Sequence, residues 1–493
     1  MTALAAHGVR RIFALSGNHV MPVFDATIGT GIAIIHVRHE AAAVHMADAF
    51  ARVTGEVGVA MVTGGPGHAN AIGALYTAAM AEAPVLLLSG HAPLHELGKG
   101  AFQEMRQAEL AAPVAKASRV AMRAEGLAAD VARAIAEAKG GRPGPVHLSL
   151  PTDVLEAHVA GTVAPPATQP ANPVNLSQVV ARLMQAERPM VLAGPAAMVR
   201  HGRGAMAALE AATGVPVVGM ESPRGVNDPS LGAFAKVLAK ADCVALVGKR
   251  RDFTLKFGKA IAQSCDVIKV DAAVGPIAAL EALARSATRE GSTPWLEEVR
   301  AAIAYRPAEW DALATVRALR SLQPVLDENR DAVFVCDGGE FGQWAQACLS
   351  APHRVINGVA GSIGAGLPFA VGARCAVREA PILAFMGDGT FGFHPAEIDT
   401  AVRHALPFVA IVGNDARWNA EHQIQLRTYG RDRLVGCELL PTRYDEVARA
   451  FGGYGGHVER AEDLLPAVRR AMASGKPAVV NVTIEGLSAP VVS

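Results

Sequence analysis

Short apolar runs alternate with longer, alanine-rich stretches along the whole chain. The runs are rich in Val, Ile and Leu, which is typical of strands that are covered on both faces of a parallel sheet. The stretches between them have the composition of crossover helices. The pattern therefore predicts an α/β fold. The predicted strands are residues 11–15, 32–37, 58–63, 84–90, 145–151, 189–195, 215–220, 243–249, 267–272, 332–339, 353–358, 381–389, 408–415 and 478–484.

These strands fall into three groups, because a chain of 493 residues is too long for one core. The Pro-, Ala- and Thr-rich segment 159–174 predicts an extended linker after the first group. A helical region over 292–313 precedes the third group. We therefore expect three doubly wound parallel-sheet domains, at residues 1–157, 172–300 and 310–493.

Composition narrows the class of protein. Lys plus Arg equals Asp plus Glu at 46 each, so no basic surface for nucleic acid or an anionic membrane is expected. The six cysteines are scattered without a CxxC pair, which indicates reduced thiols in a cytoplasmic protein. We find no signal peptide and no apolar stretch of membrane-spanning length. The chain opens inside a helix-like stretch, residues 1–15, so a shortened first helix is expected.

The sequence FMGDGTFGF at 385–393 places an aspartate between two glycines at the end of a predicted strand. Gly387 and Gly389 allow the backbone to turn sharply and to approach a ligand closely. Asp388 would then lie at the carboxyl end of the sheet, where open α/β folds bind ligands. An isolated GDG would be only a turn with a solvated aspartate. The rest of the chain therefore decides whether this motif is a ligand site.

A second polar pair, Asn414 and Asp415, ends the next predicted strand. A strand, a crossover helix over 394–406 and a parallel strand place the two strand ends side by side. Their side-chain oxygens suit a hard cation such as Mg²⁺ that also binds a phosphate, and backbone N–H groups at the following helix suit the phosphate oxygens. The pattern predicts a metal and phosphate site at this edge.

These motifs resemble the diphosphate-binding motif of thiamine diphosphate (ThDP) enzymes, and the resemblance extends over essentially the whole chain. Residues 38–55 and 58–75 look like the pyrimidine-binding domain of the acetolactate synthase and benzaldehyde lyase group. Residues 100–118 and 144–154 continue that match, and GVAGSIGAGLPFAVGA at 358–373 resembles the segment that carries the thiazolium ring. The three domains are then pyrimidine-binding, central and diphosphate-binding.

The resemblance implies ThDP and Mg²⁺ as cofactors. Glu40 would hydrogen-bond N1′ of the aminopyrimidine and favour the imino tautomer that removes the thiazolium C2 proton. A helix N-terminal acid is the structural alternative for Glu40. Ile363 falls where the family keeps a large apolar residue that bends the cofactor, and the Gly361 carbonyl would accept a hydrogen bond from the aminopyrimidine. The other residues implied to bind the cofactor are Pro66, Asn70, Gly387, Asp388, Gly389, Thr390 and Asn414.

The implied metal ligands are the side chains of Asp388 and Asp415 and the main-chain carbonyl of Arg417. The family usually has Asn at the position of Asp415. Aspartate still supplies a hard oxygen, but it adds negative charge beside a diphosphate. We therefore expect metal binding to persist with altered affinity or metal preference.

Two further residues are implied to act on the substrate. His19 sits where benzaldehyde-lyase-like members place an active-site histidine, and it would move protons to and from the hydroxyl of the enamine intermediate. Gln103 matches a glutamine that reaches the same cavity from the partner subunit. Trp418 and His422 follow the metal loop, where a place at the substrate entrance and a buried structural role are both open.

The sequence of the central domain does not identify its ligand. LVGKRRDFTLKFG at 246–258 resembles the segment that 2-hydroxyacyl-CoA lyases and oxalyl-CoA decarboxylases have here, and acetolactate synthases place FAD nearby. FAD and CoA both stay open, with nothing that supports FAD in particular. The basic residues 249–251 suit nucleotide phosphates or simply a solvated face.

The leading interpretation is a ThDP- and Mg²⁺-dependent carbon–carbon lyase or carboligase, like acetolactate synthase. It would act on small 2-oxo acids or 2-hydroxy carbonyl compounds through an enamine. His19 favours a 2-hydroxyacyl-CoA lyase or benzaldehyde-lyase-like enzyme instead. A Rossmann dehydrogenase is disfavoured because GSIGAG lacks the GxGxxG order. A non-catalytic binding subunit is disfavoured because Glu40 and Asp388 are retained. The resemblance also implies a homodimer or homotetramer with shared active sites and a small-molecule substrate.

Overall fold

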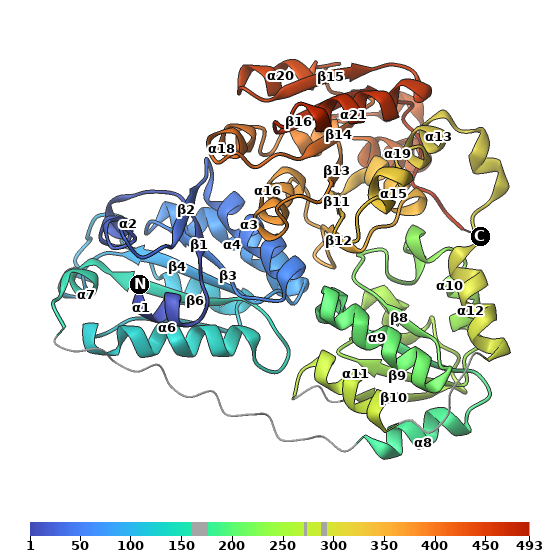
Figure 1. Ribbon diagram of the computed structural model, residues 1–493, viewed down its shortest axis with the longest axis horizontal. Helices are drawn as coiled ribbons and strands as arrows, with labels where there is room; N and C mark the ends of the chain where they lie inside the picture. The colour runs from blue at the N-terminus through green and yellow to red at the C-terminus, as the bar shows by residue number, and fades with distance from the viewer. Residues whose placement is uncertain (160–175, 271–273, 287–292, 493) are drawn as a thin grey trace. The chain divides into compact units, whose positions relative to one another are not determined.

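The computed structural model describes residues 1–159, 176–270, 274–286 and 293–492. They form three parallel sheets of six, four and six strands with interleaved helices (Figure 1), which confirms the predicted α/β class. The chain divides into two compact units, with the first sheet in one and the other two sheets in the second. The domain limits at 1–157, 172–300 and 310–493 stay predictions, and most of the predicted linker lies outside the described residues.

The first sheet has the strand order β2-β1-β3-β4-β6-β5, with every pairing parallel. Apolar side chains from α1 and α6 pack on one face, while α3 and α4 pack together on the other (Figure 1). The strands are β1 (Arg11–Ala14), β2 (Ala33–His36), β3 (Gly58–Val62), β4 (Val85–His91), β5 (Ala117–Val120) and β6 (Val146–Pro151). The helices are α1 (Thr2–Ala6), α2 (Met21–Asp25), α3 (Glu40–Thr54), α4 (Pro66–Met80), α5 (Gln107–Ala111), α6 (Ala124–Lys139) and α7 (Thr152–Glu156).

The central sheet has the order β10-β9-β7-β8 and is also parallel. Two apolar cores, one with α8, α9 and α11 and the other with α10 and α12, cover its faces. The strands are β7 (Pro189–Ala193), β8 (Val217–Gly219), β9 (Cys243–Val247) and β10 (Asp266–Val270). The helices are α8 (Ser177–Gln185), α9 (Arg200–Thr213), α10 (Phe234–Leu238), α11 (Pro276–Arg285) and α12 (Pro294–Ala304).

The third sheet has the order β12-β11-β13-β14-β16-β15. Side chains of α13, α15 and α21 build the core on one face. The strands are β11 (Val333–Cys336), β12 (His353–Ile356), β13 (Ile382–Gly387), β14 (Val409–Asn414), β15 (Tyr454–Val458) and β16 (Ala478–Thr483). The helices are α13 (Ala314–Arg320), α14 (Gln323–Asp327), α15 (Gly339–Cys348), α16 (Gly366–Ala376), α17 (Asp388–Phe391), α18 (Glu397–Arg403), α19 (Asn419–Tyr429), α20 (Tyr444–Ala450) and α21 (Leu464–Ala473).

The first and third sheets share one topology. In each, the second strand adds on one side of the first and the third strand adds on the other, so the strand order reverses between β1 and β3 and between β11 and β13. Open α/β sheets bind ligands at the carboxyl ends of strands beside such a reversal. The topology therefore directs attention to the residues that follow β1 and β3 and to those that follow β11 and β13.

Two sequence predictions concern the chain as a whole. The six cysteines are free, as their spacing predicts. In the described part of the chain, no helix has both the length and the apolar character that crossing a membrane requires.

Candidate functional site

A cavity lies at the carboxyl edge of the third sheet. Strands β13 and β14 pair in register with Gly387 opposite Gly413, so the GDG motif and Asp415 leave neighbouring strands side by side, as the sequence pattern predicts. Asp388, Asp415 and Ile363 are among the residues that line this cavity. The predicted metal, diphosphate and thiazolium segments therefore meet at one place within the second unit.

Two carboxylates face this cavity in partly desolvated surroundings. Asp388 begins α17, is 2% exposed, and accepts a hydrogen bond from the backbone N–H of Arg417 at 3.2 Å. Burial raises the pKa of Asp388 to about 6. Burial, and then repulsion from Asp388, raises the pKa of Asp415 to about 7. A pair of carboxylates that repel each other in this way offers a place for a cation.

The glycines of the GDG motif leave the backbone open. A Cβ atom at Gly387 would meet nothing within 4 Å, so the chain there is accessible to a ligand. At Gly389 a Cβ would lie 2.7 Å from the Trp418 ring, so only glycine fits between the two. The Thr390 hydroxyl donates to the Gly387 carbonyl at 3.0 Å and fixes the turn. This backbone geometry fits a phosphate group at the start of α17.

Asn357 lies next to Gly338, a residue that lines the cavity, although Asn357 itself does not. The Oδ1 atom of Asn357, a residue 3% exposed, has no hydrogen-bond partner among the described residues. In the same described ranges, no group of three or more His, Cys, Asp and Glu side chains is placed to hold a metal ion. A cation on the two aspartates would therefore need main-chain and phosphate oxygens as well, which is the ligand set that the resemblance implies.

Asp337, which the sequence pattern does not single out, organises the loop that carries Ile363. It follows β11, is fully buried, and accepts N–H hydrogen bonds from Gly338, Gly364 and Gly366 at 2.7, 3.0 and 2.7 Å. Ile363 packs so closely that a Cβ at Gly338 would lie 2.6 Å from its methyl group. Asp337 thus ties the Ile363 loop to the end of β11.

Gly361 lies in the same loop, with φ of +67°. This left-handed conformation favours glycine. Its backbone N–H donates to the Gly358 carbonyl at 3.1 Å, which closes a tight turn. The turn leaves Gly361 exposed, so its own carbonyl is available in a part of the loop that a ligand can reach.

The side chain of Asn414 makes hydrogen bonds within the protein. Its Nδ2 donates to the Thr442 carbonyl at 2.8 Å and to Asn481 Oδ1 at 3.1 Å, and its Oδ1 accepts from the Ala416 N–H at 3.2 Å. These bonds shape the loop that presents Asp415. The assignment of Asn414 to cofactor binding stays a prediction.

Trp418 and His422, the two residues noted after the predicted metal loop, differ in their surroundings. Trp418 lines the cavity and packs edge-to-face on Phe393, with ring centroids 6.2 Å apart. His422 is buried on α19 and is not one of the residues that line the cavity. The structure thus places Trp418 at the cavity and His422 away from its lining, while a role of either residue at a substrate entrance stays a prediction.

A second group of predicted residues meets in the first unit. Glu40 begins α3, and its Oε2 accepts a hydrogen bond from Asn70 Nδ2 at 3.1 Å. Pro66 is the first residue of α4, and Asn70 lies one turn further along that helix. Glu40 therefore faces the start of α4, beside the reversal between β1 and β3.

His19 lies at the same reversal, after β1. It is 6% exposed, and its Nδ1 lies 3.3 Å from Thr63 Oγ1, which follows β3. Its ring stacks on Phe102, with centroids 6.0 Å apart at 23°. Burial and then repulsion from His91 lower the pKa of His19, while hydrogen bonds to the Phe102 backbone and the Gln103 side chain act against this. The surroundings of the ring thus disfavour its protonated form and place it close to polar neighbours.

Gln103 and His19 of the same chain are neighbours. That Gln103 reaches the cavity of a partner subunit stays a prediction. Gln103 has φ of +57°, and its backbone lies against Gly65. The buried side chain of Gln107 holds this loop by accepting from the Gly65 N–H at 2.8 Å and donating to the Gly90 carbonyl at 3.1 Å.

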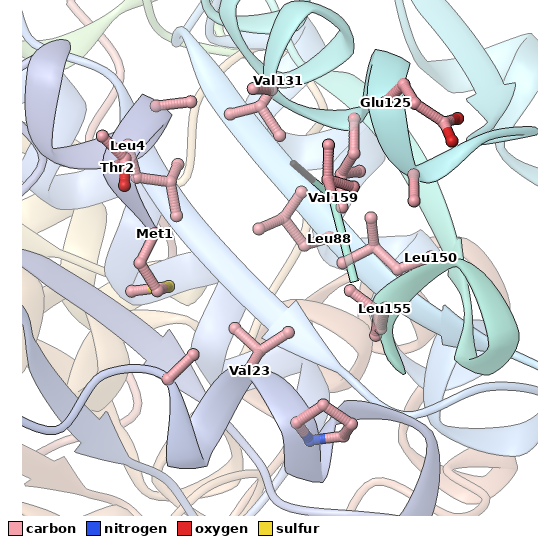
Figure 2. A pocket seen from close by; sticks show the side chains of 16 residues that line it. Met1, Thr2, Leu4, Val23, Leu88, Glu125, Val131, Leu150, Leu155 and Val159 are labelled. Atoms are coloured by element: carbon pink, nitrogen blue, oxygen red, sulfur yellow. The ribbon is translucent and has the colours of Figure 1, made fainter. Parts of the chain in front are cut away.

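A separate pocket in the first unit has a different character (Figure 2). Its lining is mostly apolar, with Leu4, Val23 and Leu88 among the side chains, and Glu125 lies at its edge. None of the predicted site residues lines it. Among the described residues, Thr2 and Glu125 are the polar side chains of its lining.

Comparison with known proteins agrees with the geometry. The N-terminal TPP binding domain of thiamine pyrophosphate enzymes matches residues 1–110, and the C-terminal TPP binding domain matches residues 337–482. An acetolactate synthase large subunit of Mycobacterium tuberculosis is 33% identical, over 97% of this chain and 94% of that protein. The 2-hydroxyacyl-CoA lyase 2 of Homo sapiens is 30% identical, over 98% of this chain and 88% of that protein.

The two matched domains and the similarity to an acetolactate synthase show a ThDP-dependent enzyme of the lyase or transferase type. The chain belongs to the thiamine pyrophosphate enzyme family.

The raised pKa of Asp415 predicts a pH effect on the protein without cofactor or metal. Because the folded state keeps this proton up to about pH 7 and the unfolded state releases it near pH 4, stability falls as pH rises between these values. Asp415→Asn removes this partly desolvated charge and should stabilise the protein at pH 8 by about 1–2 kcal/mol, after allowance for solvent. Thermal melts in EDTA at pH 5 and pH 8 measure this.

Asp432→Asn, which changes an exposed aspartate, is the control and should leave the melting temperature unchanged. A lower melting temperature for Asp415→Asn at pH 8 would contradict the prediction. It would mean that a protein cation already compensates Asp415.

Proposed function

We propose that this protein is a Mg²⁺-dependent ThDP enzyme that makes or breaks a carbon–carbon bond next to a carbonyl group, acting on small 2-oxo acids like acetolactate synthase. The observation that carries the proposal is the pair of carboxylates at neighbouring strand ends, buried Asp388 and half-buried Asp415. The similarity to an acetolactate synthase supports the substrate class. When bound, ThDP supplies a nucleophilic carbon that attacks the carbonyl group.

The residues of this chain divide into a metal group and a ring group. The side chains of Asp388 and Asp415 and the main-chain carbonyl of Arg417 would hold Mg²⁺, while the backbone N–H groups at the start of α17 would bind the diphosphate. Glu40 would share a proton with N1′ of the aminopyrimidine, and Asn70 orients its carboxylate. The other residues proposed to contact the cofactor are Pro66, Gly361, Ile363, Gly387, Gly389, Thr390 and Asn414.

We further propose that active sites are shared between chains in a homodimer or homotetramer. As in the family that the chain resembles, Glu40 of one chain would meet a cofactor whose diphosphate is held by Asp388 of another. FAD and CoA in the central domain are not part of the proposal.

The test is an assay of the purified protein, supplied with ThDP and Mg²⁺, against pyruvate, benzoin, a 2-hydroxyacyl-CoA and formaldehyde, with product identification. Acetolactate formed from pyruvate would support the proposal. Inactivity towards pyruvate with cleavage of the 2-hydroxyacyl-CoA would replace it with the second candidate below.

The second candidate is a 2-hydroxyacyl-CoA lyase or benzaldehyde-lyase-like enzyme. It is favoured by His19, which is shielded by Phe102 and lies beside Gln103. A neutral imidazole next to a polar side chain can move a proton to and from a substrate oxygen. The similarity to 2-hydroxyacyl-CoA lyase 2 agrees with this alternative.

His19→Ala distinguishes the two candidates. If His19 moves protons at the substrate oxygen, turnover should fall at least about tenfold, the low end of general acid–base effects, while the Kd of ThDP stays unchanged. Steady-state kinetics and calorimetry on one preparation measure both. His95→Ala, at an exposed histidine of the same unit, is the control. Normal turnover with a lowered melting temperature would instead assign His19 a structural role and favour the acetolactate-synthase-like reaction.

A further inference from the structure

Glu340 lines the cavity at the carboxyl edge of the third sheet, where the diphosphate is proposed to bind. This acidic residue has no role in the proposed chemistry. It lies in the first turn of α15, after the glycines that follow β11. It lines the cavity together with Asp388 and Asp415, and its side chain is 7% exposed. Water therefore screens its charge poorly.

The cavity is acidic for a site that would take a diphosphate. Glu340, Asp388, Asp415 and Glu421 line it, and Arg417 is the single basic residue among the described residues that do so. A divalent cation would balance the charges of the two aspartates but not those of the two glutamates, which would then repel a diphosphate. Glu421 is exposed, so water screens its charge. Glu340 is buried, so its charge is screened much less.

Glu340 also occupies a place that an anion would prefer. The first turn of a helix carries free N–H groups and a partial positive charge, which favour a carboxylate or a phosphate. Helix α15 is 10 residues long, and Glu340 is the acidic residue of its first turn. A phosphate that enters the cavity would therefore find a carboxylate in the first turn of this helix.

Arg224 is the cation that contacts Glu340. Its Nη2 atom lies 3.4 Å from Glu340 Oε2, and its side chain is about half exposed. Arg224 follows β8 of the central sheet, so the pair links the central and third sheets within one unit. Its attraction reduces the repulsion that Glu340 exerts on an anion.

We propose that Glu340 makes ThDP binding depend on the divalent ion, because its carboxylate opposes the diphosphate, and that Arg224 moderates this opposition by pairing with Glu340. The inference rests on the proposed function, since it concerns the diphosphate end of the cofactor. Glu340 thereby tunes affinity and takes no part in the bond-making steps.

Calorimetric titration of ThDP at stepped Mg²⁺ concentrations tests this. Glu340→Gln should lower the Kd of ThDP about tenfold at low Mg²⁺ and much less at saturating Mg²⁺. Glu421→Gln, which removes the exposed acid from the same cavity, should change Kd by less than about twofold. Arg224→Gln should weaken binding in the wild-type background and have no effect in the Glu340→Gln background, because it acts through Glu340.

Weaker ThDP binding by Glu340→Gln at all Mg²⁺ concentrations would overturn the proposal. Equal losses from Arg224→Gln in both backgrounds would also overturn it, since Arg224 would then contact the phosphate itself. If Glu340→Gln does not fold, Arg224→Gln alone decides, because the proposal requires it to steepen the Mg²⁺ dependence. A wild-type protein that binds no ThDP at any Mg²⁺ concentration would instead refute the proposed function, before any variant is tested.

Discussion

Asp388→Ala is expected to abolish ThDP binding, with the affinity lowered by roughly two orders of magnitude or more. Asp388 is 2% exposed, lies at the end of β13, and accepts a hydrogen bond from the backbone of the loop that carries Asp415. Its removal takes away a charged metal ligand and a bond that orders the second ligand. Without the ion, the acidic cavity repels the diphosphate. Calorimetry with ThDP at a fixed Mg²⁺ concentration measures the loss.

Chelation and a matched variant complete the experiment. EDTA should abolish ThDP binding by the wild-type protein, and Mg²⁺ should restore it. Asp415→Asn keeps an oxygen ligand, so it should still bind ThDP with a changed dependence on the metal. Equal ThDP affinity with and without EDTA would refute the metal bridge between Asp388 and the diphosphate.

The central strands could be predicted from the sequence, whereas two edge strands could not. A strand covered on both faces is a continuous apolar run, as β13 and β14 are, and such a run stands out in any sequence. Strand β5 is half-buried throughout, and β15 contains two glycines. Both lie at sheet edges, where one side is free of pairing and the apolar signal is weak.

In the candidate site, too, some residues could be predicted from the sequence and others could not. The GDG motif and Asp415 follow apolar runs directly, so the rules of parallel-sheet topology predict that they meet. The role of Asp337 depends on three backbone N–H groups, two of them from a loop nearly thirty residues further along the chain. No local pattern encodes that contact. The only signal was the CDGG sequence at the end of a predicted strand.

The orientation of side chains could not be predicted from the sequence either. Asn414 and Asp415 are adjacent, and the sequence predicts both at one ligand. The hydrogen bonds that the Asn414 amide donates to Thr442 and Asn481 could not be predicted from the sequence. The neighbour that each side chain finds depends on strand β16 and the 437–442 segment. Such partners are settled only when the third sheet packs.

The proposed sharing of active sites predicts that two inactive variants restore each other. Glu40→Gln should be inactive because the aminopyrimidine loses its proton-sharing partner, and Asp388→Ala because the diphosphate is not held. In a mixed dimer, one shared site carries both changes and the other carries neither. Random mixing of equal amounts therefore gives about a quarter of wild-type activity, because about half of the dimers are mixed and each has one intact site of two.

The measurement is activity after the two variants are unfolded and refolded together, with light scattering to report the mass of the active species. Glu40→Gln mixed with an equal amount of His95→Ala is the reference, because it contains intact chains and shows the yield of refolding. Glu40→Gln and Asp388→Ala refolded separately and then combined should stay inactive as long as subunits do not exchange. Restored activity in the co-refolded sample alone would support shared sites. Full activity of the wild-type protein at monomer mass would refute them, since Glu40 and Asp388 would then serve one cofactor within a single chain.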